Sequence, residues 1–288
     1  MERIIETGHA KINLALDILG KRADGYHEVR MVMQSISLAD TVVLTESKGL
    51  SLQVEGSALP CDRRNLAYQA AELLAERFGK TADVRIELKK RIFVAAGLAG
   101  GSSDAAAVLR GLNRLWQLEL TAEELEELAA KLGSDVPFCI CGGTALAEGR
   151  GEILTALPAP QEAVLVLAKP QASLSTAKIY AAYDKTEIEQ RPAIDSLLVS
   201  LRNKENALPL CGMGNVLEPV AIGFLPIIDE IKQTMLRAGA RYALMSGSGP
   251  TVFAVAADTA AADKIMKQLQ KMQLETAIAV TAQRRERV

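Results

Sequence analysis

The spacing of apolar residues along the first half of the chain predicts a mixture of strands and helices. Alternating apolar and polar positions are typical of half-buried strands, and apolar positions three or four apart are typical of amphipathic helices. In the first predicted helix Ala67, Ala70 and Leu74 share one face, and Gly79 follows as a stop signal. These patterns predict strands over 12–19, 41–45, 50–54 and 84–88, and helices over 65–78, 105–116 and 121–132.

A stretch with two prolines, Leu157-Pro-Ala-Pro-Gln161, interrupts this pattern and predicts a boundary between two domains, residues 1–158 and 159–288. In the second part, long helical runs lie between short strands that need not be parallel. This order favours an α+β fold over a doubly wound sheet. The patterns predict strands over 163–168, 242–245, 251–256 and 276–281, and helices over 176–183 and 226–238.

Composition and charge narrow the class of protein. Half of the 288 residues are hydrophobic (49%), 24% are charged, and the formal net charge is −2. This balance is ordinary for a globular protein and offers no overall field that would attract nucleic acid or an acidic membrane. The start of the chain, Met-Glu-Arg-Ile-Ile-Glu, lacks the apolar core of a signal peptide, and no apolar run is long enough to cross a bilayer. We therefore expect a cytoplasmic protein whose partners are small molecules rather than nucleic acid or membranes.

The four cysteines favour packed free thiols over a metal site. Cys139 and Cys141 lie in an apolar run, whereas Cys61 and Cys211 stand alone. The two histidines do not complete a zinc-binding cluster with them. We expect a reduced protein without a structural metal.

The segment from Val94 to Asp104, Val-Ala-Ala-Gly-Leu-Ala-Gly-Gly-Ser-Ser-Asp, carries the strongest chemical signal in the chain. Its three glycines allow positive φ and close approach of the backbone to a ligand. The helix expected directly after it begins with unpaired N–H groups and a partial positive charge. Together these features predict a binding site for an anion, in particular for phosphate.

A simpler interpretation of this segment is a glycine-rich turn in which Ser102 or Ser103 caps the following helix. One serine is enough for a cap, so the second hydroxyl and the glycine pair remain unexplained. The chain contains no Walker A loop, because the near match Gly79-Lys80-Thr81 has Leu74 where the first glycine should stand, and the segment does not fit Gly-x-Gly-x-x-Gly. A nucleotide bound here would use a different kind of loop.

Four shorter motifs carry further candidate chemistry. Lys11 and Asn13 are two residues apart on a predicted strand, so both side chains point the same way. Asp24-Gly-Tyr-His27 combines a turn signal with two rings that could meet a planar ligand. Gly133-Ser-Asp-Val-Pro-Phe138 places a carboxylate among apolar neighbours, as a general base or as a turn residue. Met245-Ser-Gly-Ser-Gly-Pro-Thr251 is either a plain turn or a second loop with N–H groups for a phosphate or sugar.

Taken in order, these motifs resemble those of the GHMP small-molecule kinases over residues 10 to about 253. The matching elements are the Ala-Lys-Ile-Asn-Leu strand, the Gly-Leu-Ala-Gly-Gly-Ser-Ser loop and the late Ser-Gly-Ser-Gly loop. The Asp-Gly-Tyr-His turn and Gly-Ser-Asp-Val-Pro-Phe are similar to the branch of the family that phosphorylates a cytidine diphosphate sugar alcohol in isoprenoid precursor synthesis. The resemblance implies ATP-dependent phosphorylation of a hydroxyl. It also implies an N-terminal domain like the second domain of ribosomal protein S5 and a C-terminal ferredoxin-like domain.

The resemblance further implies roles for individual residues. Asp135 would accept the hydroxyl proton, and Lys11 would orient that hydroxyl and keep Asp135 ionised. Tyr26 and Tyr180 would sandwich the cytosine, while His27 reads its polar edge. ATP would contact Asn65, Val94, Ala95, Ala96, Gly97, Leu98, Ala99, Gly100, Gly101, Ser102, Ser103 and Asp104, and the substrate would also contact Asn13, Thr176, Gly247 and Ser248.

Mg²⁺ is expected to accompany ATP, but the sequence identifies no protein ligands for it beyond Ser103 as one candidate. The chain departs from the family's usual residues at Phe93, Val216 and Tyr180. The first two positions lie outside the proposed chemistry, and Tyr180 keeps an aromatic face for stacking. Two other hypotheses remain open at this point. The chain could be a GHMP kinase with another acceptor, or a regulatory protein that binds ATP without turnover.

Overall fold

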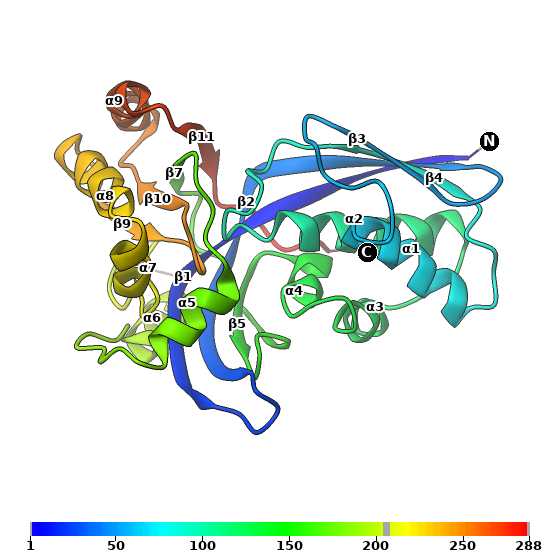
Figure 1. Ribbon diagram of the computed structural model, residues 1–288, viewed down its shortest axis with the longest axis horizontal. Helices are drawn as coiled ribbons and strands as arrows, with labels where there is room; N and C mark the ends of the chain where they lie inside the picture. Colours follow the sequence, from blue (N-terminus) through cyan, green and yellow to red (C-terminus); the bar gives the residue numbers. More distant parts are fainter. Residues whose placement is uncertain (1, 204–207, 287–288) are drawn as a thin grey trace.

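The computed structural model describes residues 2–203 and 208–286, which form two sheets with helices packed against them (Figure 1). The larger sheet has seven strands, in the order β3-β4-β2-β1-β8, with β5 on β2 and β6 on β5. The smaller has four strands, in the order β11-β7-β10-β9. This mixed architecture confirms the α+β prediction.

Two long antiparallel strands, β1 (Arg3–Lys21) and β2 (His27–Glu46), form the centre of the larger sheet. They are joined by the hairpin that contains the Asp-Gly turn. The other strands of this sheet are β3 (Ser51–Glu55), β4 (Val84–Lys89), β5 (Thr144–Glu148), β6 (Ile153–Leu157) and the short β8 (Gly214–Asn215), which pairs with β1 in parallel.

Four helices cover one face of the larger sheet (Figure 1). The longest of them, α2, packs against both central strands and buries most of its residues. It therefore fixes the glycine-rich segment, which leads into it, relative to β1. The four helices are α1 (Leu66–Arg77), α2 (Gly100–Leu115), α3 (Ala122–Ala129) and α4 (Val136–Cys141).

The four-stranded sheet is fully antiparallel. Numbered along the chain, its strands lie in the order 4-1-3-2, with helices between the first and second and between the third and fourth, as in a ferredoxin-like domain. Its strands are β7 (Val164–Lys169), β9 (Tyr242–Met245), β10 (Val252–Val255) and β11 (Glu275–Val280). The helices of this half are α5 (Thr176–Tyr183), α6 (Ile194–Arg202), α7 (Glu218–Phe224), α8 (Ile227–Arg237), α9 (Thr259–Leu269) and the 3₁₀ turn η1 (Gln270–Met272).

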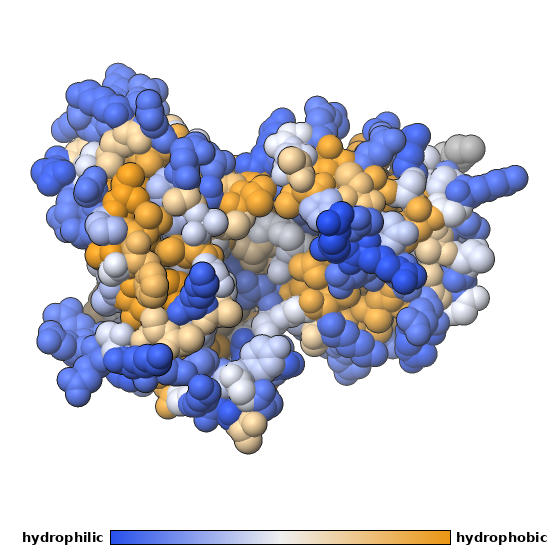
Figure 2. Space-filling model, viewed as in Figure 1, coloured by the Kyte–Doolittle hydropathy of each residue, from blue (hydrophilic) through white to orange (hydrophobic). Residues whose placement is uncertain are grey.

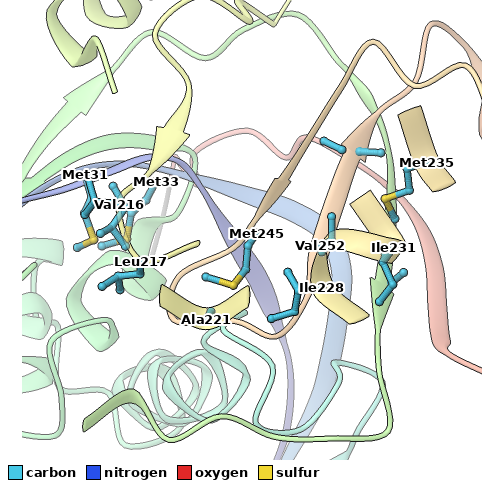
Figure 3. Packing of buried hydrophobic residues seen from close by; sticks show 14 of the residues in the cluster. Met31, Met33, Val216, Leu217, Ala221, Ile228, Ile231, Met235, Met245 and Val252 are labelled. Carbon is cyan, nitrogen blue, oxygen red and sulfur yellow. The ribbon is translucent and has the colours of Figure 1, made fainter. Parts of the chain in front are cut away.

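The hydrophobic core continues from one half of the chain into the other. Met31 and Met33 of β2 belong to the same buried cluster as Val216 and Met245, as Figure 3 shows. A second cluster joins the opposite face of β2 to β7 and β10. Because both faces of β2 are buried here, the two halves share core packing, and the predicted boundary at residues 157–161 falls in the loop between β6 and β7.

Several predicted elements needed correction. The strand predicted over 41–45 is only the end of β2, because residues 31–36 are buried on both faces and show no apolar–polar alternation. The prediction that Ser102 or Ser103 caps a helix was wrong. That helix begins at Gly100 after a left-handed Ala99, so both serines lie in its first turn. Thr121 and Glu124 form a capping box at the start of α3. No element was predicted at the positions of β5, β6, α4, α6 and α7.

The surface of the molecule is hollowed between the part that carries α5–α9 and the part that carries α1–α4 (Figure 2). Over the described ranges, no helix is long and apolar enough to span a membrane.

Candidate active site

Lys11 and Asp135 meet at the centre of the molecule. Lys11 lies on β1 with its ammonium 3.6 Å from a carboxylate oxygen of Asp135, the residue that precedes α4. The same ammonium donates to Asn13 Oδ1 at 2.8 Å and to the carbonyl of Gly97 at 3.4 Å. Three motifs that are far apart in the sequence therefore meet at one ammonium group. The side chain of Asp135 is partly exposed.

The glycine-rich segment forms a backbone cradle at the start of α2. Ala95, Gly97 and Ala99 have φ values of 50°, 75° and 56°, so positive φ recurs at every second residue. Alternating backbone conformations of this kind turn successive N–H groups toward one side, and such a nest binds anions. The first N–H groups of α2 follow directly after this nest, and they have no partners in the helix's own backbone.

The late serine–glycine loop of the second half packs directly on this cradle. Ser246 Oγ donates to the carbonyl of Gly97 at 3.0 Å. A Cβ at position 97 would lie only 2.3 Å from the carbonyl oxygen of Ser246, so glycine is required there by close approach as well as by φ. Asn215 donates to the carbonyls of Met245 and Gly247, and it thereby holds the loop from behind.

A single cavity of about 980 Å³ connects these elements. It extends from the cradle past Lys11 and Asp135 to the β1–β2 hairpin and α5. Its volume is at the upper end of the range that is typical of small-molecule sites. The predicted residues that line it are Lys11, Asn13, Tyr26, His27, Val94, Ala95, Ala96, Gly97, Ala99, Gly100, Gly101, Ser102, Asp135, Thr176, Tyr180, Gly247 and Ser248.

At the far end of the cavity, aromatic rings surround an ion pair. His27 Nε2 lies 2.6 Å from a carboxylate oxygen of Asp184, which also pairs with Lys21 at 2.9 Å. The pKa of Asp184 lies below its ordinary value, chiefly because it accepts a hydrogen bond from His27. The rings of His27 and Tyr180 are 5.0 Å apart, and Tyr26, at the tip of the β1–β2 hairpin, has 55% of its surface exposed.

Four of the predicted residues do not line the cavity. Asn65 caps α1, accepting from the N–H of Ala67, and Leu98 is part of the core. Ser103 is buried and donates to the carbonyl of Gly100, while Asp104 points inward from α2. Sequence reasoning also missed four charged residues that do line the cavity, namely Lys21, Lys90, Arg150 and Asp184. Lys21 and Lys90 stand close to recognised motifs in the sequence.

Two carboxylates share one ammonium beneath the cradle. Lys90 Nζ lies 2.6 Å from Asp104 Oδ2 and also contacts Asp40, and all three side chains are buried. Asp40 accepts further hydrogen bonds from the N–H groups of Arg91 and Ile92, whereas Asp104 Oδ1 is buried without a partner among the described atoms. Burial raises the pKa of Asp104 to about 7, with Lys90 opposing the shift and Asp40 adding to it.

This cluster predicts a pH-dependent effect of Asp104→Asn on stability. Between the ordinary pKa of an aspartate and about 7, the folded protein holds a proton on Asp104 that the unfolded chain has lost. The free energy of unfolding due to this group therefore falls as the pH rises through that window. Asparagine removes the titration, so the variant should be more stable relative to the native protein at pH 8 than at pH 5. Urea unfolding at both pH values measures this, and an equal difference at both would contradict it.

The four cysteines differ in their exposure, with Cys61 and Cys211 at the surface. All four are free, and Cys141 is buried. Burial, helped by the nearby charge of Asp135, raises the pKa of the Cys139 thiol to about 12. No group of three or more His, Cys, Asp or Glu residues in residues 2–203 and 208–286 is arranged to hold a metal ion.

Comparison with known proteins agrees with this fold. The model of the GHMP kinases N-terminal domain matches residues 65–143, and that of the GHMP kinases C-terminal domain matches residues 197–273. The chain belongs to the GHMP kinases, and it is an ATP-dependent small-molecule kinase.

Relatives with high identity carry a more specific name. The chain is 54% identical over 254 residues to the 4-diphosphocytidyl-2-C-methyl-D-erythritol kinase of Bacillus pumilus (strain SAFR-032), which covers 87% of each chain. It is 52% identical to the enzyme of that name from Geobacillus kaustophilus (strain HTA426), over 85% of each chain. A crystal structure of 4-(cytidine 5'-diphospho)-2C-methyl-D-erythritol kinase has a TM-score of 0.81 and 34% identity, covering 97% of this chain and 99% of the other. A homoserine kinase from Cytophaga hutchinsonii, at 20% identity and a TM-score of 0.76, shares the fold.

Proposed function

We propose that this chain transfers the γ-phosphoryl group of ATP to the 2-hydroxyl of 4-diphosphocytidyl-2-C-methyl-D-erythritol, a step in the non-mevalonate synthesis of isoprenoid precursors. The observation that carries the proposal is the pairing of Lys11 and Asp135 between the phosphate cradle and the aromatic end of one cavity. A kinase needs its acceptor hydroxyl, its base and the γ-phosphate close to one another. A hydroxyl beside Asp135 would lie between the two ends of the cavity. The names of the high-identity relatives support the choice of acceptor.

The cradle would bind the triphosphate through its backbone. The nest at 95–99 and the first turn of α2 direct N–H groups at one anion, and Ser102 adds a hydroxyl to the cavity wall. Phosphoryl transfer depends mainly on positioning and on stabilising charge on the phosphoryl oxygens. A rigid set of backbone dipoles on a buried helix suits that task because it needs no reorganisation during the reaction.

Asp135 would accept the proton of the attacking hydroxyl. The lysine beside it, 3.6 Å away, carries a positive charge that attracts the hydroxyl and the phosphoryl oxygens. Asn13 accepts a hydrogen bond from the same ammonium and so fixes its direction. On this account Lys11 positions and polarises the acceptor hydroxyl, and Asp135 accepts the proton of that hydroxyl.

The aromatic end would hold the cytidine. Tyr26 and Tyr180 would provide the faces for stacking, each base–aromatic contact contributing about 1–3 kcal/mol. Because His27 Nε2 is engaged by Asp184, His27 would meet the base through Nδ1. Thr176 and Ser248, whose hydroxyls are 2.8 Å apart, would close over the acceptor from the second half of the chain.

Mg²⁺ fits this site as an ion that arrives with ATP. The described residues offer no cluster of three acidic or histidine ligands, so the phosphate oxygens and water would supply most of its coordination. Ser102 lines the cavity and could add one oxygen, whereas the hydroxyl of Ser103 is turned toward the carbonyl of Gly100. When bound, the ion neutralises charge on the phosphates.

A coupled assay of ADP release with Mg-ATP tests this function. The proposed cytidyl acceptor is compared with mevalonate and homoserine at equal concentrations. We expect ADP release with the cytidyl acceptor alone. Turnover of mevalonate or homoserine instead would assign a different acceptor, and ATP binding without turnover of any of the three would indicate a regulatory protein.

A further inference from the structure

Arg150 is a charged residue of the cavity that lies in the turn between β5 and β6. Its guanidinium carbon is 5.1 Å from the centre of the Tyr26 ring. A guanidinium above an aromatic face within about 6 Å is attracted by the ring electrons, and its flat shape also stacks on the ring. The contact therefore joins a residue outside the recognised motifs to the ring that would stack on the acceptor's base.

The turn that carries Arg150 is tied to the strand that carries the hairpin. The N–H of Val29 donates to the carbonyl of Gly149 at 2.8 Å, and the N–H of Gly149 donates to Glu28 Oε1 at 3.1 Å. Glu152 accepts from the N–H of Arg150 at 2.6 Å and pairs with its side chain at 3.4 Å. The position of the guanidinium is thus set by the same strand end that sets the position of Tyr26.

Tyr26 needs such support because it stands at the tip of a hairpin. Its backbone N–H is held by Asp24 Oδ1 at 3.0 Å, but more than half of the residue is exposed. The pKa of Asp24 lies below its ordinary value, first because of this hydrogen bond and also because the charges of Arg22 and Arg150 are near. Arg150 therefore faces the hairpin turn as well as the ring, and it restricts the orientations that the ring can adopt.

The positively charged side chains that line the cavity differ in whether they can contact the Tyr26 ring. Lys11 pairs with Asp135, and Lys90 pairs with two buried carboxylates, so neither reaches the hairpin. Lys21 pairs with Asp184 on the side of His27. Among the described cations that line the cavity, Arg150 is the one stacked on an aromatic ring of the acceptor end.

We propose that Arg150 is a positioning residue for acceptor binding, which holds the ring of Tyr26 in the orientation that stacks on the pyrimidine base. The inference rests on the proposed function, since it assigns the base of a cytidine nucleotide to the face of Tyr26. In this role Arg150 affects acceptor binding only through the ring of Tyr26. A direct contact between Arg150 and the acceptor's phosphates would be a different role.

A double-mutant cycle tests this dependence. The variants are Arg150→Gln, Tyr26→Leu and the two combined, and the readouts are the dissociation constant of cytidine 5′-diphosphate and the kcat and KM of the reaction. We expect Arg150→Gln to raise that dissociation constant and the acceptor KM by about three- to fivefold, the size of an exposed cation–π contact, with kcat and the KM for ATP unchanged. In the Tyr26→Leu background the same change should have an effect below about 1.5-fold.

Two further variants separate the ring contact from the charge. Arg150→Lys keeps the charge but loses the flat group that stacks on the ring, so we expect a dissociation constant between those of Arg150→Gln and the native protein. Arg85→Gln removes one charge from the outer face of β4, outside the cavity lining, and should leave all constants unchanged.

The outcomes distinguish this inference from the proposed function. If the native protein turns over the cytidyl acceptor but Arg150→Gln binds the nucleotide as well as the native protein does, the inference is overturned and the function stands. Equal losses in the Tyr26 and Tyr26→Leu backgrounds would also overturn it, because Arg150 would then act on the phosphates directly. If the native protein neither binds cytidine 5′-diphosphate nor phosphorylates the acceptor, both the inference about Arg150 and the proposed function are contradicted.

Discussion

Asp135→Asn lowers kcat by at least about 100-fold while the fold and the KM for ATP are retained. The substitution keeps the size of the side chain but removes the oxygen that accepts the hydroxyl proton, and a positioned base contributes at least that factor. Lys11, 3.6 Å from the carboxylate, loses its charge partner but keeps its hydrogen bond to Asn13. Initial rates with saturating ATP and acceptor measure the effect, with circular dichroism and thermal unfolding as checks on the fold.

Asp195→Asn provides the matched control for this prediction. Asp195 is an exposed carboxylate on α6 that pairs with Arg30 and lies outside the cavity lining. Its variant should keep kcat within about twofold of the native value, in line with other surface substitutions. Near-native kcat in Asp135→Asn would remove this residue from the proton transfer.

Arg110→Met lowers the free energy of unfolding by about 3–5 kcal/mol, the cost of breaking a buried ion pair from one side. Arg110 is 1% exposed on α2, and its five N–H groups make hydrogen bonds to Glu6 on β1 and to the carbonyls of Thr7, Cys139 and Ile140. Methionine fills much of the space but leaves the carboxylate and the carbonyls without this donor. Urea unfolding of the native and variant proteins at one pH gives the difference.

Arg114→Met is the matched control, because Arg114 is one turn further along α2 and pairs with the same Glu6. Its side chain is 47% exposed, so water can replace the interaction, and we expect a loss below about 1 kcal/mol. Similar losses at the two arginines would show that burial of Arg110 is not the source of its effect. Arg110 also matters for the site, because it links three elements that carry it. α2 follows the cradle, β1 carries Lys11, and α4 follows Asp135.

The sequence predicted those elements best in which one face is buried and the other is in water. The helix over 176–183 has the predicted bounds, and the helix over 226–238 is shorter by one residue at each end. The pattern failed where tertiary packing covers both faces. Residues 31–36 of β2 lie between two core clusters, so the apolar–polar alternation that marks a strand is absent.

Local rules also failed where the backbone serves a ligand-binding shape. A serine ahead of a helical run is the usual sign of a cap, but α2 begins at Gly100 after three residues with alternating positive φ. Small side chains and glycines permit that conformation without specifying it. Likewise, the contact of Lys11 with Asp135 joins residues on β1 and before α4, and no spacing along the chain predicts such a pair. It was the resemblance to the GHMP kinases that brought these two residues together, together with Tyr26 and Tyr180.

The residues that sequence reasoning missed share one property, which is that their roles depend on partners distant in the chain. Asp184 pairs with Lys21 and His27 from the end of α5, and Arg150 reaches Tyr26 from the β5–β6 turn. Neither residue stands in a motif of its own. Their contribution becomes visible only when the hairpin, the turn and α5 are seen around one cavity.

A crystal structure with a non-hydrolysable ATP analogue and 4-diphosphocytidyl-2-C-methyl-D-erythritol tests the central claim most directly. The account predicts that the acceptor's 2-hydroxyl lies about 3 Å from a carboxylate oxygen of Asp135, with the triphosphate against the backbone of residues 94–104. A 2-hydroxyl out of hydrogen-bond reach of Asp135, or a triphosphate bound away from that backbone, would contradict it.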